Sequence, residues 1–174
     1  MNDIIDFLDN YEASKPKKQR KQPYRKPKSV KELELMAFVA KCDKYPNTDP
    51  KLLAPFHFRD DTANGLTACI VKYLELKKCF AGRVNTQGTY NKKLGKYIYS
   101  GAKRGMADIS AVINGKHISI EVKIGKDKPR PEQLKVKEQV EQAGGVYIFV
   151  SSFDNFLSQV AEYENNIDLQ NIKT

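Results

Sequence analysis

Apolar and polar residues alternate most strictly between residues 107 and 124, in two runs rich in β-branched side chains. These runs, 107–113 and 116–124, flank the dipeptide Asn114-Gly115. Asn-Gly favours the tight two-residue turn that joins antiparallel strands. The pattern therefore predicts a β-hairpin whose register is fixed by its turn.

This register separates the side chains of the hairpin onto two chemically different faces. Counting outward from the turn, Asp108 comes to lie directly opposite Glu121. The apolar face carries Ile109, Ala111, Ile113, Ile118, Ile120, Val122 and Ile124. The polar face carries Asp108, Ser110, Val112, His117, Ser119, Glu121 and Lys123. Two carboxylates are thus predicted to be cross-strand neighbours, with an ammonium beside them.

Helical periodicity and capping residues predict the elements around the hairpin. Helices are expected at 29–42, 62–79 and 131–143, and a last one begins after Ser152. Ser29 and Glu32 have the spacing of a capping box, and Thr62 is a typical N-cap. Gly144 supplies the end of the third helix.

Three further strands complete the expected fold, at residues 80–86, 97–100 and 146–150. The last, VYIFV, is continuously apolar, which is typical of a strand buried on both faces. It follows the hairpin through a helix, and such a crossover implies parallel pairing. The sequence therefore predicts an α/β fold with a central mixed sheet flanked by helices on both faces.

The order of these elements divides the chain into four parts. Residues 1–28 are expected to be a flexible basic N-terminal arm, since 13–28 holds eight basic residues, three prolines and no acid. Residues 29–59 form an accessory helix and loop, 60–163 the main domain, and 164–174 a C-terminal tail. The arm is interpreted as a non-specific contact to phosphates, or else as a solvated linker.

The net charge of +9 indicates a polyanionic partner. No apolar run approaches the roughly 20 residues that cross a bilayer, and the acidic start is unlike a signal peptide, so we expect a cytoplasmic protein with no membrane partner. The three cysteines lack the spacing of a zinc site or a disulfide framework. With two histidines in the chain, a histidine-rich metal site is excluded.

The opposed acids give the polar face its chemical interest, because like charges in register destabilise a sheet unless something compensates them. Mg²⁺ prefers hard oxygen ligands and lowers the pKa of a bound water. Lys123 could then orient the attacking water or offset charge on a phosphate. The alternative is a solvated polar face, since Glu-x-Lys also occurs at 75–77 within an expected helix.

Several of these motifs together carry a resemblance to a known family. Gly101 and Gly105, then Ala-Asp-Ile, the hairpin, Ile-Glu-Val-Lys and a helix beginning near Gln133 resemble the PD-(D/E)xK nuclease superfamily. More narrowly, Arg83-Val84-Asn85 with Gly88, and the later 143–147, are similar to its VRR-NUC-type and phage-borne members. The resemblance covers about residues 60–157. It implies a restriction-endonuclease-like αβββαβ core and metal-dependent phosphodiester hydrolysis in a bacterial or phage-infected cell.

The resemblance also implies roles for particular residues. Asp108 and Glu121 are the expected ligands of Mg²⁺ or Mn²⁺, joined by the backbone carbonyl of Val122. Lys123 is the expected catalytic lysine and Gln133 a helix-borne accessory residue. No small-molecule cofactor and no nucleophilic residue are implied.

Two positions depart from the family pattern. Ala107 stands where proline is frequent, which leaves the metal ligands untouched. The first core helix has no glutamate within 62–66, and Asn64 is the substitute we predict, with Asp60 and Asp61 also near. This difference leaves open whether one or two ions bind, and whether turnover is retained.

Basic residues around the hairpin are the expected substrate contacts. Arg83 and Asn85 on one strand face, and Lys103 and Arg104 before the first acid, are predicted to hold nucleic-acid phosphates. Lysines 92, 93 and 96 precede them. Tyrosines 90, 97 and 99 are interpreted either as stacking on bases or, as is more usual in strands, as packing.

These inferences predict a metal-dependent DNA endonuclease, and they leave open whether it is structure-specific for branched or flapped DNA. The alternatives are a non-catalytic nucleic-acid-binding protein on the same fold, and an RNA-directed nuclease. Branch-cutting members of the family are commonly dimers, so a homodimer is compatible with the resemblance, although the sequence marks no interface.

Overall fold

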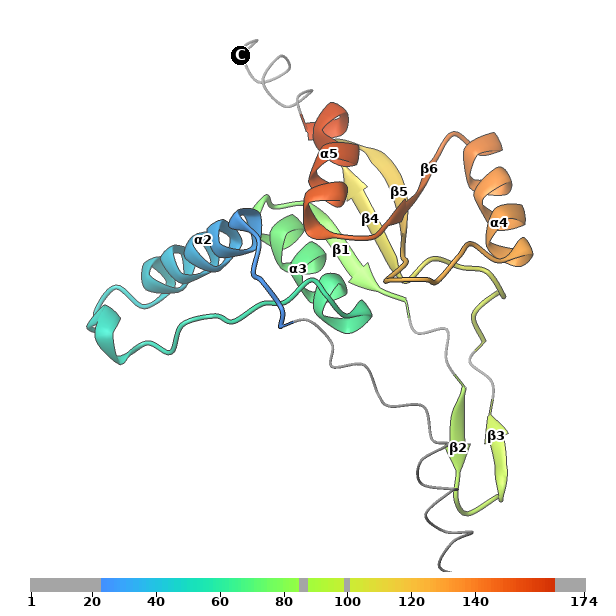
Figure 1. Ribbon diagram of the computed structural model, residues 1–174, viewed down its shortest axis with the longest axis horizontal. Helices are drawn as coiled ribbons and strands as arrows, with labels where there is room; N and C mark the ends of the chain where they lie inside the picture. Colours follow the sequence, from blue (N-terminus) through green and yellow to red (C-terminus); the bar gives the residue numbers. More distant parts are fainter. Residues whose placement is uncertain (1–22, 85–87, 99–100, 165–174) are drawn as a thin grey trace, which may run out of the picture.

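The computed structural model describes residues 23–84, 88–98 and 101–164 (Figure 1). The helices are α2 (Lys28–Lys44), the short 3-10 helix η1 (Pro50–Leu52), α3 (Ala63–Leu76), α4 (Pro131–Gln142) and α5 (Phe153–Glu164). The strands are β1 (Phe80–Arg83), β2 (Thr89–Asn91), β3 (Lys96–Ile98), β4 (Ile109–Ile113), β5 (Lys116–Val122) and β6 (Val146–Val150). The fold is mixed α/β, as the sequence predicts.

A four-stranded sheet in the order β1-β4-β5-β6 forms the centre of the molecule. β4 is antiparallel to both β1 and β5, whereas β6 runs parallel to β5 after the crossover through α4. Asn114 and Gly115 have φ of +49° and +77°, the positive values that a tight hairpin turn requires. Ile113 pairs with Lys116 and Ile109 with Ile120, so the predicted register is confirmed.

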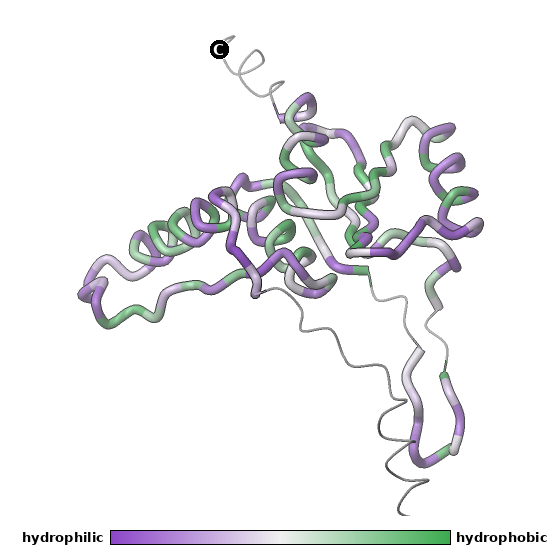
Figure 2. Tube along the Cα trace, viewed as in Figure 1, coloured by the Kyte–Doolittle hydropathy of each residue, from purple (hydrophilic) through white to green (hydrophobic). Residues whose placement is uncertain are grey.

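The apolar face of the sheet packs against α3 and α5, and α2 joins the same core by packing on these two helices. Every second residue of β4 is buried, and these side chains meet Leu66, Ile70 and Leu74 of α3. The opposite face is covered by α4, where Val136 packs against Ala107 and Tyr147. Figure 2 shows the hydrophobic colouring following the strands of the sheet, whereas α4 is largely hydrophilic. Because both faces are covered, Ser119 and Glu121 of β5 are also buried, whereas Lys116 and His117 near the turn are exposed.

Helices α3 and α4 begin as the sequence predicts. Thr62 caps α3 by accepting a hydrogen bond from the backbone N–H of Gly65 at 3.2 Å. A side chain at Gly65 would lie 2.2 Å from the carbonyl oxygen of Arg59, so glycine permits this close approach. Pro131 occupies the first position of α4, where its missing N–H costs nothing. Gly144 ends that helix with φ of +83°.

Other predicted elements differ from the structure. The capping box at Ser29 is wrong, since α2 begins one residue earlier after Pro27, without a side-chain cap, and the Ser29 hydroxyl is buried without a hydrogen-bond partner. The strand expected at 97–100 is observed in part as β3 (Lys96–Ile98), and residues 99–100 lie outside the described residues. β3 pairs with β2, which the sequence did not predict. Residues 43–59, expected to be loop throughout, include η1.

The ends of the chain are partly described. Residues 1–22 of the predicted basic arm, and 165–174 of the predicted tail, lie outside the described residues. Tyr24, within the predicted flexible arm, is fixed to the core because its hydroxyl donates to Oδ1 of Asp60 at 2.9 Å. None of the described helices combines the length and the apolar character needed to cross a bilayer.

Candidate functional site

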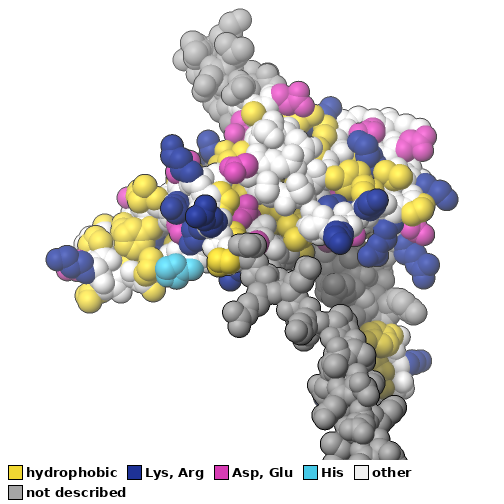
Figure 3. All heavy atoms as spheres, viewed as in Figure 1, with side chains coloured by type: hydrophobic (Ala, Val, Ile, Leu, Met, Phe, Trp, Pro, Cys, Tyr) yellow, Lys and Arg dark blue, Asp and Glu magenta, His cyan; other side chains and the backbone are white. Residues whose placement is uncertain are grey.

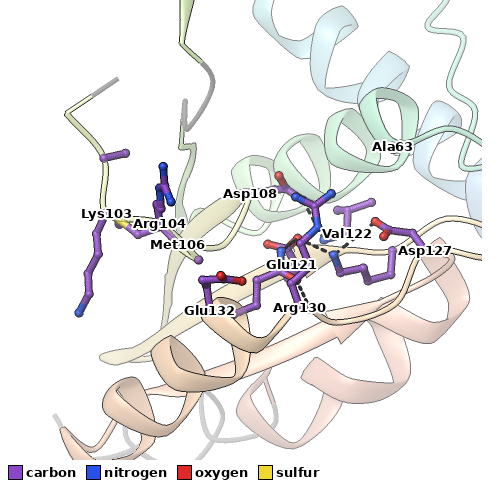
Figure 4. A pocket seen from close by; sticks show the side chains of 14 residues that line it. Ala63, Lys103, Arg104, Met106, Asp108, Glu121, Val122, Asp127, Arg130 and Glu132 are labelled. Atoms are coloured by element: carbon purple, nitrogen blue, oxygen red, sulfur yellow. Dashed lines mark hydrogen bonds and ion pairs between the residues drawn. The ribbon is translucent and has the colours of Figure 1, made fainter. Parts of the chain in front are cut away.

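A cavity of about 810 Å³ opens where the polar face of the hairpin meets α4 (Figure 4). It is lined by Ala63, Ala102, Lys103, Arg104, Gly105, Met106, Asp108, Glu121, Val122, Lys123, Asp127, Arg130, Glu132 and Gln133. These residues come from the start of α3, the segment before β4, the end of β5 and the start of α4. The four predicted catalytic residues, Asp108, Glu121, Lys123 and Gln133, are therefore brought together.

The two acids lie at the open end of the hairpin. Asp108 directly precedes β4, and the pairing of Ile109 with Ile120 places it opposite Glu121. Oδ2 of Asp108 accepts a hydrogen bond of 3.0 Å from the backbone N–H of Val122. This contact fixes the orientation of the Asp108 carboxylate. The other acid, Glu121, is buried and is only 5% exposed.

The burial of Glu121 raises the pKa of its carboxyl group, and the negative charge of Asp108 raises it further. Lys123 and Gln133 oppose this effect, because both stabilise the ionised form. The net pKa is nevertheless higher than usual. Ionised Glu121 thus has an uncompensated electrostatic cost, which a cation bound between the two acids would remove.

Lys123 is held between two carboxylates. Its Nζ lies 3.1 Å from Oε1 of Glu121 and 3.3 Å from Oδ2 of Asp127. The Lys123 and Glu121 side chains are 8% and 6% exposed, whereas that of Asp127 is 45% exposed. A buried charge needs a partner, since leaving one uncompensated costs about 3–5 kcal/mol. Lys123 is therefore fixed beside the acid pair mainly through Glu121.

Gln133 connects the first turn of α4 to the acid pair. Its Nε2 donates to Oε1 of Glu121 at 2.5 Å, and its Oε1 accepts from the backbone N–H of Arg130 at 2.9 Å. The second contact satisfies a donor at the helix N-terminus that would otherwise lack a partner. Because both ends of the amide are engaged, Gln133 orients Glu121 and has a structural role as well.

Tyr147 of β6 lies beneath the acids and was missed by the sequence analysis. Its side chain is buried, and its hydroxyl is 3.2 Å from the Gly105 carbonyl oxygen and 3.5 Å from Oε2 of Glu121. Burial raises the pKa of Tyr147, as do the charges of Glu121 and Asp108, so the hydroxyl stays protonated and can donate. The signal was available, since parallel pairing places Tyr147 beside Ser119, on the face that carries Glu121.

Asp127, Arg130 and Glu132 were also missed by the sequence analysis. All three line the cavity, and Figure 4 shows Arg130 extending into it towards Asp108. Their positions depend on how the chain between β5 and α4 folds back over the end of the hairpin. The opposing signs of their charges were the only signal in the sequence.

The predicted phosphate contacts divide into two groups. Lys103 and Arg104 line the cavity, and Lys103 donates to the side chain of Gln139 on α4. Arg83 does not line it, and its guanidinium instead donates to Oδ1 of Asn64 at 2.8 Å. Asn85 lies outside the described residues.

The helix position that faces the cavity is Ala63, and not Asn64. Asn64 was predicted to replace the glutamate that many members of the PD-(D/E)xK superfamily, which the sequence resembles, carry on the first core helix. Its amide oxygen is occupied by Arg83, and its side chain does not line the cavity. One residue corresponds to about 100° around a helix, which is enough to turn a side chain away. The α3 side of the cavity therefore presents a methyl group.

The donor set suits a hard cation bound by few protein ligands. Within the described residues, no group of three or more His, Cys, Asp and Glu side chains is placed to hold a metal ion. Mg²⁺ needs only one or two carboxylates when waters and phosphate oxygens complete its shell. The Val122 carbonyl lies on the same strand edge as its N–H, which faces Asp108. Asp108, Glu121 and Val122 therefore fit such an ion.

No protein-family model matches the sequence, and no curated protein matches it.

Proposed function

We propose that this protein is a metal-dependent nuclease that hydrolyses phosphodiester bonds in DNA. The observation that carries the proposal is the placement of Asp108, Glu121 and Lys123 on one face of a hairpin, in one cavity. A pair of acids in register, an adjoining amine and a basic wall are the parts that phosphodiester hydrolysis requires.

The order of elements supports a place in the PD-(D/E)xK superfamily. Around the four-stranded sheet the chain runs α3, β1, β4, β5, α4, β6, which is the αβββαβ order that the resemblance implies. The β2–β3 hairpin is then an insertion between the first and second strands of that core. Fold and site are thus two separate arguments for the same class.

The residues divide the chemistry between them. Asp108 and Glu121, with the Val122 carbonyl, would hold Mg²⁺ or Mn²⁺. Such an ion, when bound, offsets negative charge on the phosphate and lowers the pKa of water. Lys123 places a positive charge beside Glu121, where it can orient the attacking water. Gln133 keeps Glu121 in position.

The walls of the cavity supply the attraction for a polyanion. Lys103 and Arg104 stand on one side and Arg130 on the other, as Figure 4 shows. These cations hold backbone phosphates next to carboxylates that would otherwise repel them. Contacts of this kind carry no sequence information, so the cavity itself favours cleavage without base specificity.

A second candidate function is nucleic-acid binding without turnover, and Ala63 is the observation that favours it. Since α3 contributes no carboxylate to the cavity, the site has fewer acidic ligands than many relatives are expected to have. A binder of this kind would need no metal ion, and its affinity would fall with salt.

Cleavage assays on purified full-length chain test the proposal. Wild type with Mg²⁺ or Mn²⁺ is expected to cut at least one member of a panel of linear, branched and flapped DNA and matched RNA. Asp108→Asn and Lys123→Ala are each expected to lower the rate by about 10²–10³-fold. Asp43→Asn and Lys31→Ala change the same charges on exposed positions of α2 and serve as controls.

The same variants separate the two candidate functions. For a nuclease, Mg²⁺ raises the melting temperature of wild type but not of Asp108→Asn. Activity that survives both site substitutions would exclude this site. DNA binding without product, insensitive to the metal, would favour the binding function instead.

A further inference from the structure

The β2–β3 hairpin projects away from the body of the molecule in Figure 1. Among the described residues its two strands pair only with each other, with Tyr90 opposite Tyr97. Their burial pattern contains no buried position, so the ribbon has no core beneath it. An isolated two-stranded hairpin is only marginally stable in water.

Large apolar side chains are exposed along this ribbon. Tyr90, Leu94, Tyr97 and Ile98 are 49%, 59%, 65% and 46% exposed. The two tyrosine rings lie 5.2 Å apart between centroids, tilted by 58°. This arrangement disfavours the interpretation of these tyrosines as core packing, because their outer surfaces face solvent.

The tip of the hairpin has a defined shape of its own. Oδ1 of Asn91 accepts hydrogen bonds from the backbone N–H groups of Lys93 and Leu94, at 2.9 and 3.1 Å. Gly95 then reverses the chain with φ of +62°. The tip is thereby held so that lysine and leucine side chains point outward.

The charge of the hairpin selects its partner. From residue 88 to 98 the chain contains three basic residues and no acidic one. Lys92, Lys93 and Lys96 are all exposed around the tip. In Figure 3 the described part of the β2–β3 hairpin, at the lower right, shows hydrophobic and basic side chains together. Interleaved lysines and aromatic rings suit phosphates and bases, and a two-stranded ribbon fits the major groove of DNA.

We propose that the β2–β3 hairpin is a DNA-binding arm that enters a groove of the double helix beside the cavity. The lysines contact phosphates, and Tyr90, Tyr97 and Leu94 contact the bases. The assignment of the partner rests on the proposed function, and it extends that function by making the substrate double-helical on at least one side of the cleaved bond.

The chain itself limits where this contact falls. Nine residues separate Leu94 at the tip from Lys103 in the wall of the cavity. An extended chain spans at most about 3.3–3.6 Å per residue, so the tip reaches about 30 Å from Lys103. Since DNA rises about 3.4 Å per base pair, the arm contacts the duplex within about nine base pairs of the cavity.

Binding to fluorescent duplexes, measured by anisotropy without divalent metal, tests the arm. A triple variant, Lys92→Ala, Lys93→Ala and Lys96→Ala, removes its charge, and a double variant, Tyr90→Ala and Tyr97→Ala, removes its rings. The triple variant Lys31→Ala, Lys44→Ala and Lys51→Ala is the matched control, because it removes the same charge from α2 and η1, which lie on another side of the molecule in Figure 1.

Both arm variants are expected to bind a 30-base-pair duplex at least tenfold more weakly than the control does. The lysine variant should also lower the slope of log affinity against log salt by about 3, one unit per phosphate contact. When the duplex is shortened stepwise from 30 base pairs, the difference from the control should shrink below threefold at a length of about nine base pairs or fewer, where the duplex no longer spans both the cavity and the arm. Melting temperatures should stay unchanged, because no residue of β2 or β3 is buried in the part of the chain that the structure describes.

Three results would overturn the proposal that the β2–β3 hairpin binds DNA. They are equal weakening by the arm and control triples, equal loss on the short and long duplexes, and conversion of a dimer to a monomer in sedimentation by the tyrosine variant. The last would make the ribbon an interface between copies of the chain. If wild type cleaves DNA but the arm variants bind as tightly as wild type does, the DNA-binding role of the hairpin is refuted and the nuclease proposal is not. If the arm variants lose affinity in the length-dependent way expected but wild type cleaves no substrate, the nuclease proposal is refuted and the DNA-binding role of the hairpin is not.

Discussion

The side-chain amide of Gln133 lies within 2.5 Å of Glu121, although Gln133 belongs to α4 and Glu121 to β5. This hydrogen bond stabilises the ionised form of a carboxyl group whose pKa is raised by burial and by Asp108. The contact thus links the packing of α4 to the charge state of the acid pair.

Replacing Gln133 is expected to shift the pH dependence of cleavage. Gln133→Leu removes a donor to ionised Glu121, so the pKa of that group rises further and the acidic limb of the rate profile moves to higher pH. The measurement is the cleavage rate against pH at saturating Mg²⁺. Gln142→Leu, at the exposed end of α4, is the control. An acidic limb that stays in place would show that Glu121 does not determine it.

Glu121 is expected to destabilise the folded protein increasingly as the pH rises. Its pKa in the folded state lies above its ordinary value, so the unfolded chain releases this proton at lower pH than the folded chain does. Stability is lost as the pH rises from the ordinary pKa through the raised one. In urea unfolding, the stability of Glu121→Gln relative to that of wild type should therefore increase as the pH rises from 4 to 7. Glu138→Gln, on the exposed face of α4, should show no such trend.

Gly105 holds the segment before β4 against α4, and alanine there is expected to weaken both stability and activity. Its φ is +85°, and a Cβ atom would lie 2.3 Å from the carbonyl oxygen of Glu132. The strain costs about 1–3 kcal/mol of unfolding free energy, measured in urea. Gly101→Ala is the control, because a Cβ atom there meets nothing within 4 Å. Equal stability of the two variants would contradict this account.

Asp60 joins three parts of the chain, and its removal is expected to loosen α5. Its Oδ2 accepts from the backbone N–H of Phe153 at 3.1 Å, and its Oδ1 accepts from the Tyr24 hydroxyl at 2.9 Å. Asp60→Ala removes a cap from α5 and is expected to cost about 1–2 kcal/mol. Tyr24→Phe removes only the second contact.

Urea unfolding of the two variants separates these contributions. The loss in Asp60→Ala should exceed the loss in Tyr24→Phe. If Tyr24→Phe costs as much, the effect comes from the tether of residues 23–27 and not from the helix cap. Asp154→Ala, exposed in the first turn of α5, is the matched control.

The β4–β5 hairpin was predictable because everything that specifies it is local. Asn114-Gly115 fixes the turn, strict alternation fixes the faces, and the register follows from both. The parallel β6 was predictable for a similar reason, since a buried apolar strand after a crossover helix has few alternatives. The cross-strand position of Asp108 and Glu121 therefore came directly from the sequence.

The errors fall where a side chain depends on packing between distant elements. Ser29 has the spacing of a cap, yet α2 docks so that the hydroxyl is buried and the helix starts after Pro27. Asn64 was chosen over Ala63 because of its chemistry, but the rotation of α3 against the sheet decides which of them faces the cavity. Short, exposed β2 has no hydrophobic alternation to mark it.

The sequence by itself determined the hairpin, the face that carries its acids and the mixed α/β order, because turns, caps and alternation act between near neighbours. Only the tertiary structure decided that Gln133 and Tyr147 meet Glu121, that Asp127 meets Lys123, and that Arg130 enters the cavity. These contacts join residues from different elements, and their geometry follows from how α4 and β6 pack on the sheet. That packing minimises exposed apolar area over the whole chain and has no local signature.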